Sequence, residues 1–333
     1  MNIKAIDINN LTTEEVENLY SINCHITDKY GLLKRFKNAS EYQNSFLSMI
    51  ATSNDELFLI EDNATTCGIL SFVKSADWSG KEQYKLTIYI CDPTPTKPII
   101  DCLSQLIDNK LQQHEELAII TYNNELDGLI KKYPHKVNLK ANAYTLTKKD
   151  IDIGMINNAL ATYQSNNNDL RMVYTDIISE EYIKQYCNLF METQEDMTDV
   201  KEAGFVRYAL TPEKQRQINE SNAKRNFAHH CYMIFNSNNE MIAKTNVSVN
   251  NNNPQFPYQF MIGVKQQYRG RGLGRWLYAA MYKKLFEEVA FEKVLVMHHP
   301  ENKHMINISA WVGYKLSYFE TTILLSHHKQ SLQ

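Results

Sequence analysis

The chain has 333 residues, of which 43% are hydrophobic and 22% charged, a length and composition typical of a globular protein with room for two domains. Its net charge is only −3, so the overall charge gives no indication of a protein that binds nucleic acid or a membrane. The opening segment MNIKAIDINNLTTEE lacks the apolar core of a signal peptide, and no stretch approaches the roughly 18 apolar residues of a membrane span. We therefore expect a cytoplasmic protein.

The cysteines and histidines form no recognisable metal or disulfide pattern. None of the six cysteines has C-x-x-C spacing, and each lies in or near a predicted strand or helix, so we expect free, buried thiols. The histidine pairs 229/230, 298/299 and 327/328 lack the spacing of zinc-binding helices. We predict no metal site.

The first 150 residues read as alternating helices and strands. Thr12-Thr13-Glu14-Glu15 is a typical helix start, and the helix continues to Cys24. A hairpin around Asp62-Asn63 joins two predicted strands. The expected strands are 56–60, 67–73, 84–90, 117–122 and 143–147, with a helix at 124–133.

Part of this first half repeats a part of the second half. The segment CDPTPTKPIIDCLSQLIDNKL after Ile90 aligns without gaps with KQQYRGRGLGRWLYAAMYKKL after Val264, and Leu103 then matches Leu277. The order of strand, loop and helix is the same, but the loop chemistry differs. The stretch Pro95-Thr96-Lys97-Pro98-Ile99-Ile100 has two prolines without N–H groups and no glycine, so it should not bind a phosphate.

The middle of the chain is polar and then becomes amphipathic again. Residues 164–169, QSNNND, have the composition of a linker. Beyond it we expect a strand at 172–177 and a helix at 180–192. The tripeptide Thr211-Pro212-Glu213 follows further along.

The most informative stretch is QFMIGVKQQYRGRGLGRWL, residues 259–277. An apolar strand, 260–264, enters a turn in which Gly270, Gly272 and Gly274 alternate with basic residues, and a helix follows. Glycines let the backbone approach an anion, and the helix N-terminus adds positive potential, so the expected ligand is a pyrophosphate. The stretch has neither the GxxxxGK[ST] pattern of a P-loop nor the last glycine of a Rossmann fingerprint.

A second segment, HHPENKHMINISAWVGYK, follows a short predicted strand at 293–297. It predicts a helix that starts near Asn302, buries Met305, Ile308 and Val312, and ends at Gly313 in the left-handed conformation.

The pattern R-x-x-G-x-G at 269–274 and this closing segment together resemble the GNAT acyltransferase superfamily. Within it, the T-P-E helix start and the loop R-G-x-G-L-G-R-W-L resemble tandem-GNAT proteins of mycothiol-synthase type. The likeness covers about 173–325 well and the first 150 residues only by architecture.

The resemblance implies an α/β (α+β) protein with two tandem GNAT folds, each a mixed, mostly antiparallel twisted sheet flanked by helices. Residues 1–150 would be a degenerate copy without the CoA loop, 151–170 a linker, 171–326 the catalytic domain and 327–333 a disordered tail. A second acyl-CoA site of unusual form in the first copy is the alternative.

The resemblance also implies acetyl-CoA as the cofactor. The pantetheine would bond the backbone of the strand at 262–264, the glycine loop would hold the pyrophosphate, and Asn302 would bond the pantetheine amides. The expected cofactor-binding residues are Ile262, Gly263, Val264, Arg269, Gly270, Arg271, Gly272, Leu273, Gly274, Arg275, Asn302 and Ser309.

The catalytic residues are harder to identify from the sequence. Many GNAT relatives place a tyrosine, the acid for the leaving thiolate, where this chain has Ser309, and a serine hydroxyl is shorter and far less acidic. Tyr258 and His298, at strand ends, are expected to supply a base or to orient the amine, with a packing or surface role as the alternative. The acidic segment ETQEDMTDV offers Glu192 and Asp196 on the acceptor side, with a solvated loop as the alternative.

The function implied is acetyl transfer from acetyl-CoA to a primary amine of a small-molecule acceptor. A non-catalytic acyl-CoA-binding or regulatory protein is the alternative that the missing tyrosine supports. Nucleic-acid binding through Arg269, Arg271 and Arg275 lacks the broad basic patch that phosphate-backbone contacts require, so we expect no nucleic-acid partner and no membrane partner. The acceptor and the oligomeric state are not revealed by the sequence.

Overall fold

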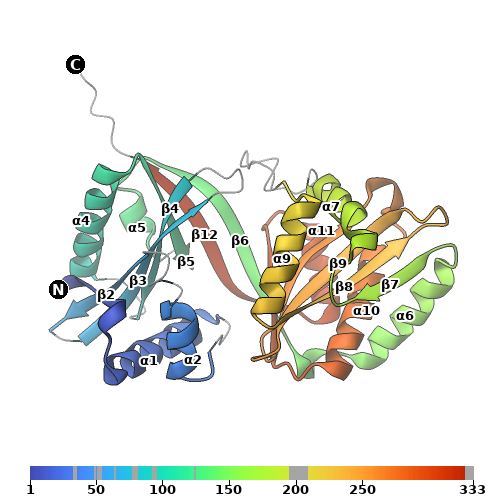
Figure 1. The fold of residues 1–333 in the computed structure, drawn as a ribbon. Coiled ribbons are helices and arrows are strands. Elements are labelled where there is room, and N and C mark those ends of the chain that lie inside the picture. Colours follow the sequence, from blue (N-terminus) through green and yellow to red (C-terminus); the bar gives the residue numbers. More distant parts are fainter. Residues whose placement is uncertain are drawn as a thin grey trace, which may run out of the picture. The chain divides into compact units, whose positions relative to one another are not determined.

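The computed structural model describes residues 1–32, 36–48, 50, 55–63, 65–76, 82–91, 96–123, 125–194 and 209–326 (Figure 1). The chain divides into two compact units. Unit 1 comprises Met1–Asn142 and Ser317–Gln333, and unit 2 comprises Ala143–Leu316. The boundaries fall inside the strands β6 (His135–Thr147) and β12 (Lys315–Ser326), so each of these strands contributes residues to both units.

Unit 1 begins with the helix that the sequence predicts at Thr12. Thr12 and Glu15 form a reciprocal capping box, and Gly31 ends the helix with a φ of 66°. The elements of unit 1 before β6 are β1 (Asn2–Ala5), α1 (Thr13–Tyr30), α2 (Ala39–Tyr42), β2 (Glu56–Asp62), β3 (Thr65–Ala76), β4 (Glu82–Ile90), α4 (Lys97–Gln113), β5 (Glu116–Tyr122) and α5 (Asp127–Ile130). The helix expected at 124–133 is thus only four residues long within the described part of that segment.

The sheet of unit 1 has the strand order β1-β2-β3-β4-β5-β12. Its neighbours run antiparallel except for β4 and β5, which run parallel because α4 crosses over between them. Leu103 and Leu111 of α4 are buried in one cluster with Leu86 and Ile119 from the strands of this sheet. The parallel pair and its crossover helix are the part of unit 1 that corresponds to the repeated segment.

Unit 2 begins at the end of β6. Its further elements are α6 (Ile153–Asn166), β7 (Arg171–Thr175), α7 (Glu180–Gln194), α9 (Pro212–Lys224), β8 (Phe227–Phe235), β9 (Met241–Asn250), β10 (Tyr258–Val264), α10 (Leu273–Glu288), β11 (Lys293–His298) and α11 (Lys303–Val312). Thr211 caps α9 by accepting from the Lys214 N–H, and Pro212 opens its first turn, as the T-P-E segment predicts.

The sheet of unit 2 has the order β11-β10-β9-β8-β7, and β10 and β11 are its parallel pair. Successive residues of these strands point to opposite faces of the sheet, and helices cover both faces. Cys231 and Met233 of β8 pack with α7, whereas Val247 and Val249 of β9 pack with α10 on the opposite face.

The segment 151–170 differs from the expected linker because most of it is the helix α6. Asp152 caps α6 by accepting from the Met155 N–H, and Ile156 is fully buried in the core of unit 2. The polar run QSNNND lies where this helix ends, so its composition marks a helix terminus. The unit boundaries at 142/143 and 316/317 likewise differ from the expected boundaries at 150 and 170.

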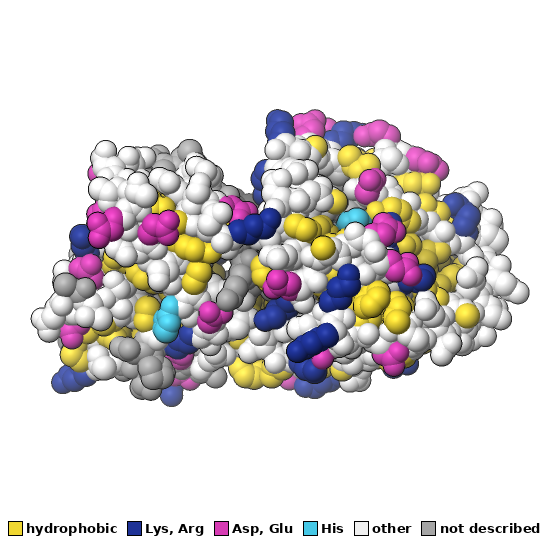
Figure 2. Space-filling model, turned by 90° about the horizontal axis from the view of Figure 1, so that it is seen from below, with side chains coloured by type: hydrophobic (Ala, Val, Ile, Leu, Met, Phe, Trp, Pro, Cys, Tyr) yellow, Lys and Arg dark blue, Asp and Glu magenta, His cyan; other side chains and the backbone are white. Residues whose placement is uncertain are grey.

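The expected fold class is confirmed: both units are α/β, with largely antiparallel sheets flanked by helices. All six cysteines are free thiols, and Cys67, Cys187 and Cys231 are buried. In the part of the chain that the structure describes, every helix is too short or too polar to traverse a lipid bilayer. Figure 2 shows acidic side chains interspersed among the basic ones on one face of the molecule.

Candidate active site

The centre of the candidate site is an irregularity in β10. The pairing of β10 with β9 shifts register between Gln259 and Ile262, which is the signature of a β-bulge. On its other edge β10 pairs with β11 at a single position, Tyr258 with Leu295. The two parallel strands therefore separate after Tyr258, and no strand of the described part of the chain pairs with the following backbone of β10 on that edge.

A buried polar network fixes this bulge. The Gln259 side chain is 1% exposed, and its Nε2 donates to Thr245 Oγ1 and to the Asn246 carbonyl, both at 3.0 Å. The Tyr282 hydroxyl donates to Gln259 Oε1 at 3.1 Å and also contacts the Tyr314 hydroxyl. A fully satisfied buried network of this kind holds one backbone conformation, so Gln259 positions the bulge.

The bulge turns an aromatic residue outward. Phe260 is 46% exposed although it lies within a strand. The centroid of its ring lies 4.7 Å from that of Tyr258 and 6.2 Å from that of His229. On the α7 side of β10, a Cβ at Gly263 would lie 2.7 Å from Thr193 Oγ1, so α7 packs closely only because residue 263 is glycine.

The glycine turn leads directly into α10. Gly270 and Gly272 have φ angles of 81° and 78°, in the left-handed region that glycine adopts without strain. Gly272 occupies the N-cap position of α10, so no side chain caps this helix, and its first turn holds no acidic residue. Backbone N–H groups at such a terminus are free to bind an anion, as the sequence predicts.

The three arginines of the turn have partners within unit 2. Arg269 Nε donates to the Val264 carbonyl at 3.0 Å, and the Arg275 guanidinium lies 5.4 Å from the centroid of the Trp311 ring. Arg271 donates to Asn167 Oδ1 at 3.1 Å and to Asp169 Oδ1 at 2.6 Å, and its hydrogen bond lowers the pKa of Asp169. Arg271 thus ties the turn to the segment that follows α6.

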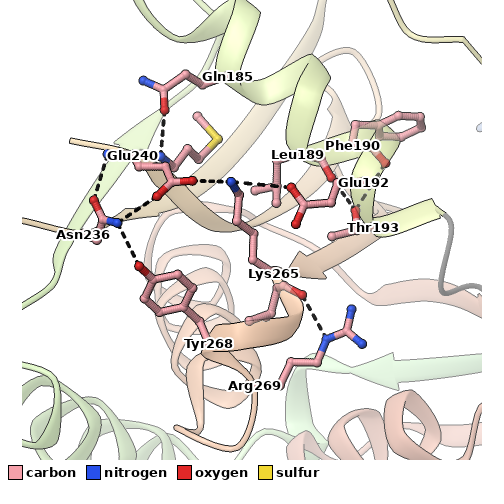
Figure 3. Close-up of polar contacts among 12 residues, drawn as sticks. Gln185, Leu189, Phe190, Glu192, Thr193, Asn236, Glu240, Lys265, Tyr268 and Arg269 are labelled. Carbon is pink, nitrogen blue, oxygen red and sulfur yellow. Dashed lines mark hydrogen bonds and ion pairs between the residues drawn. The ribbon is translucent and has the colours of Figure 1, made fainter. Parts of the chain in front are cut away.

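The start of the turn is also anchored by Lys265, which bridges two carboxylates (Figure 3). Lys265 Nζ bonds Glu240 and lies 3.5 Å from Glu192 Oε2. Burial disfavours the lysine charge, but Glu240 and Glu192 outweigh burial and raise the pKa of Lys265. Asn236 extends the cluster by donating to Glu240 at 3.0 Å and to the Tyr268 hydroxyl at 2.9 Å.

This cluster changes the interpretation of the acidic segment. Glu192, which the sequence predicts on the acceptor side of the site, is part of an ion pair that connects α7 to the glycine turn. The second acidic candidate, Asp196, lies outside the described residues.

The closing helix α11 forms as predicted and packs beside the turn. Asn302 caps it by accepting from the Met305 N–H at 3.2 Å, and Gly313 ends it with a φ of 114°. A Cβ at Gly274 would lie 3.1 Å from Ile308, so α11 contacts the first turn of α10. Asn302 Oδ1 is therefore used for capping, and only its amide N–H groups are left for a ligand.

Ser309 and His298 form a buried pair. Ser309 Oγ lies 2.7 Å from His298 Nε2, and their side chains are 0% and 7% exposed. Burial lowers the pKa of His298 to about 4, so the imidazole is neutral at pH 7. The Tyr278 hydroxyl is buried beside Ser309 without a well-formed hydrogen bond, and burial raises its pKa to about 12. Two residues predicted separately are thus brought together.

The structure also reveals residues that the sequence did not single out. Gln259 and Lys265 flank the strand that carried the prediction, but their partners lie on β9, α7 and the β8–β9 hairpin. Such partners cannot be read from spacing along the chain.

The chain is similar to known proteins in part of its sequence and in its fold. Residues 188–314 match the model of the acetyltransferase (GNAT) family. No curated protein sequence matches the chain.

Solved structures resemble it over nearly its whole length. A tandem GNAT protein from the clavulanic acid biosynthesis pathway superposes with a TM-score of 0.62 at 12% identity, covering 98% of both chains. A GCN5-related N-acetyltransferase from Sphaerobacter thermophilus gives 0.61 at 8% identity, covering 97% of this chain and 95% of that one. At such low identity the likeness concerns the fold, and it confirms the expected tandem architecture.

Proposed function

We propose, from the premise that residues 188–314 form a GNAT acetyltransferase domain, that unit 2 transfers an acetyl group from acetyl-CoA to a primary amine of a small molecule. The observation that carries the proposal is the separation of β10 from β11 beyond the bulge. Among the described residues no strand pairs with this edge at Ile262–Val264, where Arg269 Nε bonds the Val264 carbonyl, so an extended pantetheine chain can bond the remaining backbone groups as an added strand.

The glycine turn fits the pyrophosphate of acetyl-CoA. The uncapped N-terminus of α10 offers N–H groups, and Gly270 has no heavy atom within 4 Å of the position that its Cβ would occupy. Arg269 lies at the surface of the turn, where its guanidinium can contact a phosphate, whereas Arg271 acts from behind by holding the turn. Asn302, at the start of α11, has amide N–H groups to offer the pantetheine.

The proposed reaction is a direct transfer in a complex that holds both substrates. The neutral amine attacks the thioester carbonyl, a C–N bond forms, the C–S bond breaks, and CoA leaves as the thiolate. The amine loses one proton, and the thiolate can take one up. A backbone N–H at the β10 bulge is our proposed donor to the oxyanion.

The proton carriers are proposed from their positions. The Ser309–His298 pair is the proposed relay to the leaving thiolate, because His298 is neutral and accepts or donates through Nε2. Tyr258, beside the exposed Phe260, is the proposed group that orients the amine. Glu192 contributes to the turn through Lys265, and Asp196 is kept as a proposed base on the acceptor side.

A second candidate function has one observation in its favour. Ser309 is fully buried where relatives place a tyrosine acid, which suits a protein that binds acyl-CoA without turning it over.

Unit 1 is proposed to be a degenerate copy, because α1 side chains occupy its corresponding strand end. The narrower kinship with mycothiol-synthase-type proteins is likewise proposed, on the T-P-E start of α9 and the glycine turn.

Calorimetric titration with acetyl-CoA, in parallel with CoA release in the presence of amines, tests the proposal. One site per chain with amine-dependent release is the expected result. Binding without release from any amine would favour the non-catalytic alternative, and the absence of binding would refute both.

A further inference from the structure

Strand β9 carries polar side chains on the face that α7 covers. Lys244 Nζ lies 4.1 Å from the centroid of the Tyr186 ring and 5.0 Å from that of Phe190, and Asn246 accepts from the Tyr186 hydroxyl at 3.4 Å. Because side chains alternate along a strand, Ser248 lies on the same face. A strand face beneath a helix is ordinarily apolar, so this polar face (Lys244, Asn246 and Ser248) needs an explanation.

The inner end of the polar face is a buried cation without a hydrogen-bond partner. Lys244 is 0% exposed, and among the described residues none accepts a hydrogen bond from its Nζ. Burial lowers the pKa of Lys244 to about 8, so most of the lysine is still charged at pH 7. A buried ammonium without an acceptor is costly, and ring contacts offset only part of that cost.

Unit 1 contains a lysine in a similar environment, but with a carboxylate beside it. Lys110 is 8% exposed, and its Nζ lies 4.0 Å from the centroid of the Phe72 ring. The two carboxylate oxygens of Glu56 accept from Lys110 at 2.7 and 2.8 Å. The comparison indicates which partner Lys244 lacks within the described ranges of the chain: a carboxylate.

The outer end of the polar face reaches the bulge of the candidate active site. Ser248 pairs in register with His229 of β8 and with Tyr258 of β10, so a small side chain lies between two rings. Phe260 stacks nearly parallel to the His229 ring, with 6° between their planes. His229 Nε2 is a second buried polar atom without a partner among the described residues. An aromatic rim with unsatisfied polar atoms is typical of a ligand-binding surface.

We infer that the acceptor of unit 2 is an amine that also carries a carboxylate, an amino acid in the broad sense, and that Lys244 binds this carboxylate. The amine then lies by the β10 bulge, with Phe260 and Tyr258 against the carbon skeleton of the acceptor. The four-carbon stem of Lys244 lets the ammonium adjust its position to the ligand. The inference rests on the proposed acetyl transfer and names its substrate class.

The test compares amino acids with the amines that lack only their carboxylate: L-phenylalanine with phenethylamine, L-lysine with cadaverine, and β-alanine with ethylamine. CoA release from acetyl-CoA is measured for each. In at least one pair we expect the wild-type kcat/KM to be at least tenfold higher for the amino acid.

Lys244→Met separates a carboxylate contact from differences in amine basicity. We expect the variant to lower kcat/KM for the preferred amino acid at least tenfold more than for its paired amine. Lys110→Met is the matched control, since it removes a buried lysine far along the chain, and it should leave the preference unchanged. Equal losses for both members of each pair in Lys244→Met would overturn the inference.

Binding provides a second readout that does not depend on turnover. In the presence of CoA, the preferred amino acid should raise the Tm of the wild type but not that of Lys244→Met. If acetyl-CoA binds and no amino acid gives a Lys244-dependent effect in either assay, the inference is wrong and the proposed function stands. If acetyl-CoA itself does not bind, the proposed function fails first.

Discussion

The two units end their parallel strand pairs in different ways. In unit 1, β4 pairs with β5 over Lys85–Thr87, and the end of β4 is occupied by side chains of α1. Lys29 Nζ and the Tyr30 hydroxyl donate to the Ile90 carbonyl at 2.7 and 3.2 Å, and the Tyr30 hydroxyl accepts from the Ile90 N–H at 3.2 Å. In unit 2, the Val264 carbonyl at the corresponding position accepts instead from Arg269 Nε of the glycine turn itself, at 3.0 Å.

The end of β4 in unit 1 is filled by a polar cluster of the unit's own side chains. Tyr30 also contacts Glu125, which pairs with Lys29 at 3.2 Å, so the strand end of unit 1 is a satisfied polar cluster. Burial and Glu125 raise the pKa of Tyr30, which keeps its hydroxyl protonated as a donor. The bonds that we propose for pantetheine in unit 2 are thus made within unit 1 by its own side chains.

The largest effect on the binding function of unit 2 is expected from a methyl group added to its glycine turn. In Gly272→Ala, the residue would need a φ of 78°, and its Cβ would lie 2.4 Å from the Tyr163 ring. We expect acetyl-CoA binding to fall below detection by calorimetry, together with a lower Tm.

Two further variants distinguish a loss of acetyl-CoA binding at the turn from a general loss of stability. Gly270→Ala meets no atom within 4 Å but carries a φ of 81°, so it should weaken acetyl-CoA binding with a smaller loss of Tm. Gly128→Ala in unit 1 also meets no atom and should change neither quantity. Unaltered acetyl-CoA affinity in both Gly270→Ala and Gly272→Ala would refute the turn as the pyrophosphate site.

Acid should destabilise unit 2 through its buried histidines. Burial lowers the pKa of both His298 and His229 to about 4, below the ordinary value, so the unfolded chain binds protons first as the pH falls. The stability from the neutral imidazoles is complete above about pH 6.5 and is lost as the pH falls towards 4, on the order of 3 kcal/mol for His298. Denaturant unfolding, followed by tryptophan fluorescence from pH 7.5 to 4, measures the loss. If a His298→Gln variant loses as much stability over this pH range as the wild type, the prediction is wrong.

Opening the strand end of unit 1 should have a smaller effect. Tyr30→Phe removes the hydroxyl that bonds Ile90 and Glu125, which should lower the stability of unit 1 by about 2 kcal/mol. We expect the acetyl-CoA affinity and the stoichiometry of one per chain to be unchanged. A second acetyl-CoA site in Tyr30→Phe would mean that unit 1 is a closed binding site, contrary to the proposed degenerate copy.

The smallest expected effect concerns Glu192. Its contact with Lys265 is 3.5 Å long and half exposed, and Lys265 keeps Glu240, so Glu192→Gln should raise the KM for acetyl-CoA about twofold with little change in kcat. A fall in kcat of a hundredfold or more would instead identify Glu192 as the general base.

The sequence predicted the local structures of the site well. The glycine turn that opens α10, the start of α11 near Asn302 and its left-handed end at Gly313 follow from residue types at short spacing, and the structure has all of them. The fold class followed from the resemblance of the glycine turn and the closing segment to the GNAT superfamily, and the repeated strand, loop and helix agreed with a tandem arrangement.

Features that depend on distant partners were not predicted. The β10 bulge is held by Gln259 through Tyr282 and Thr245, and Arg271 binds Asp169 instead of pointing freely to a ligand. The prediction of a linker at 151–170 missed the helix α6, because the amphipathic face of this segment is recognised only once α10 is known to pack on it. Each of these depends on contacts that no spacing rule encodes.

The strand β12 gives the two units different histories during synthesis. Its residues Glu320–Ser326 pair with β5 of unit 1 over the whole length of that strand, yet they are translated after all of unit 2. Until β12 has been synthesised, this edge of β5 therefore lacks its partner strand, although the rest of unit 1 precedes unit 2 in the chain. The unit that is translated first is completed last, and an exposed strand edge must be kept from pairing with other chains in the meantime.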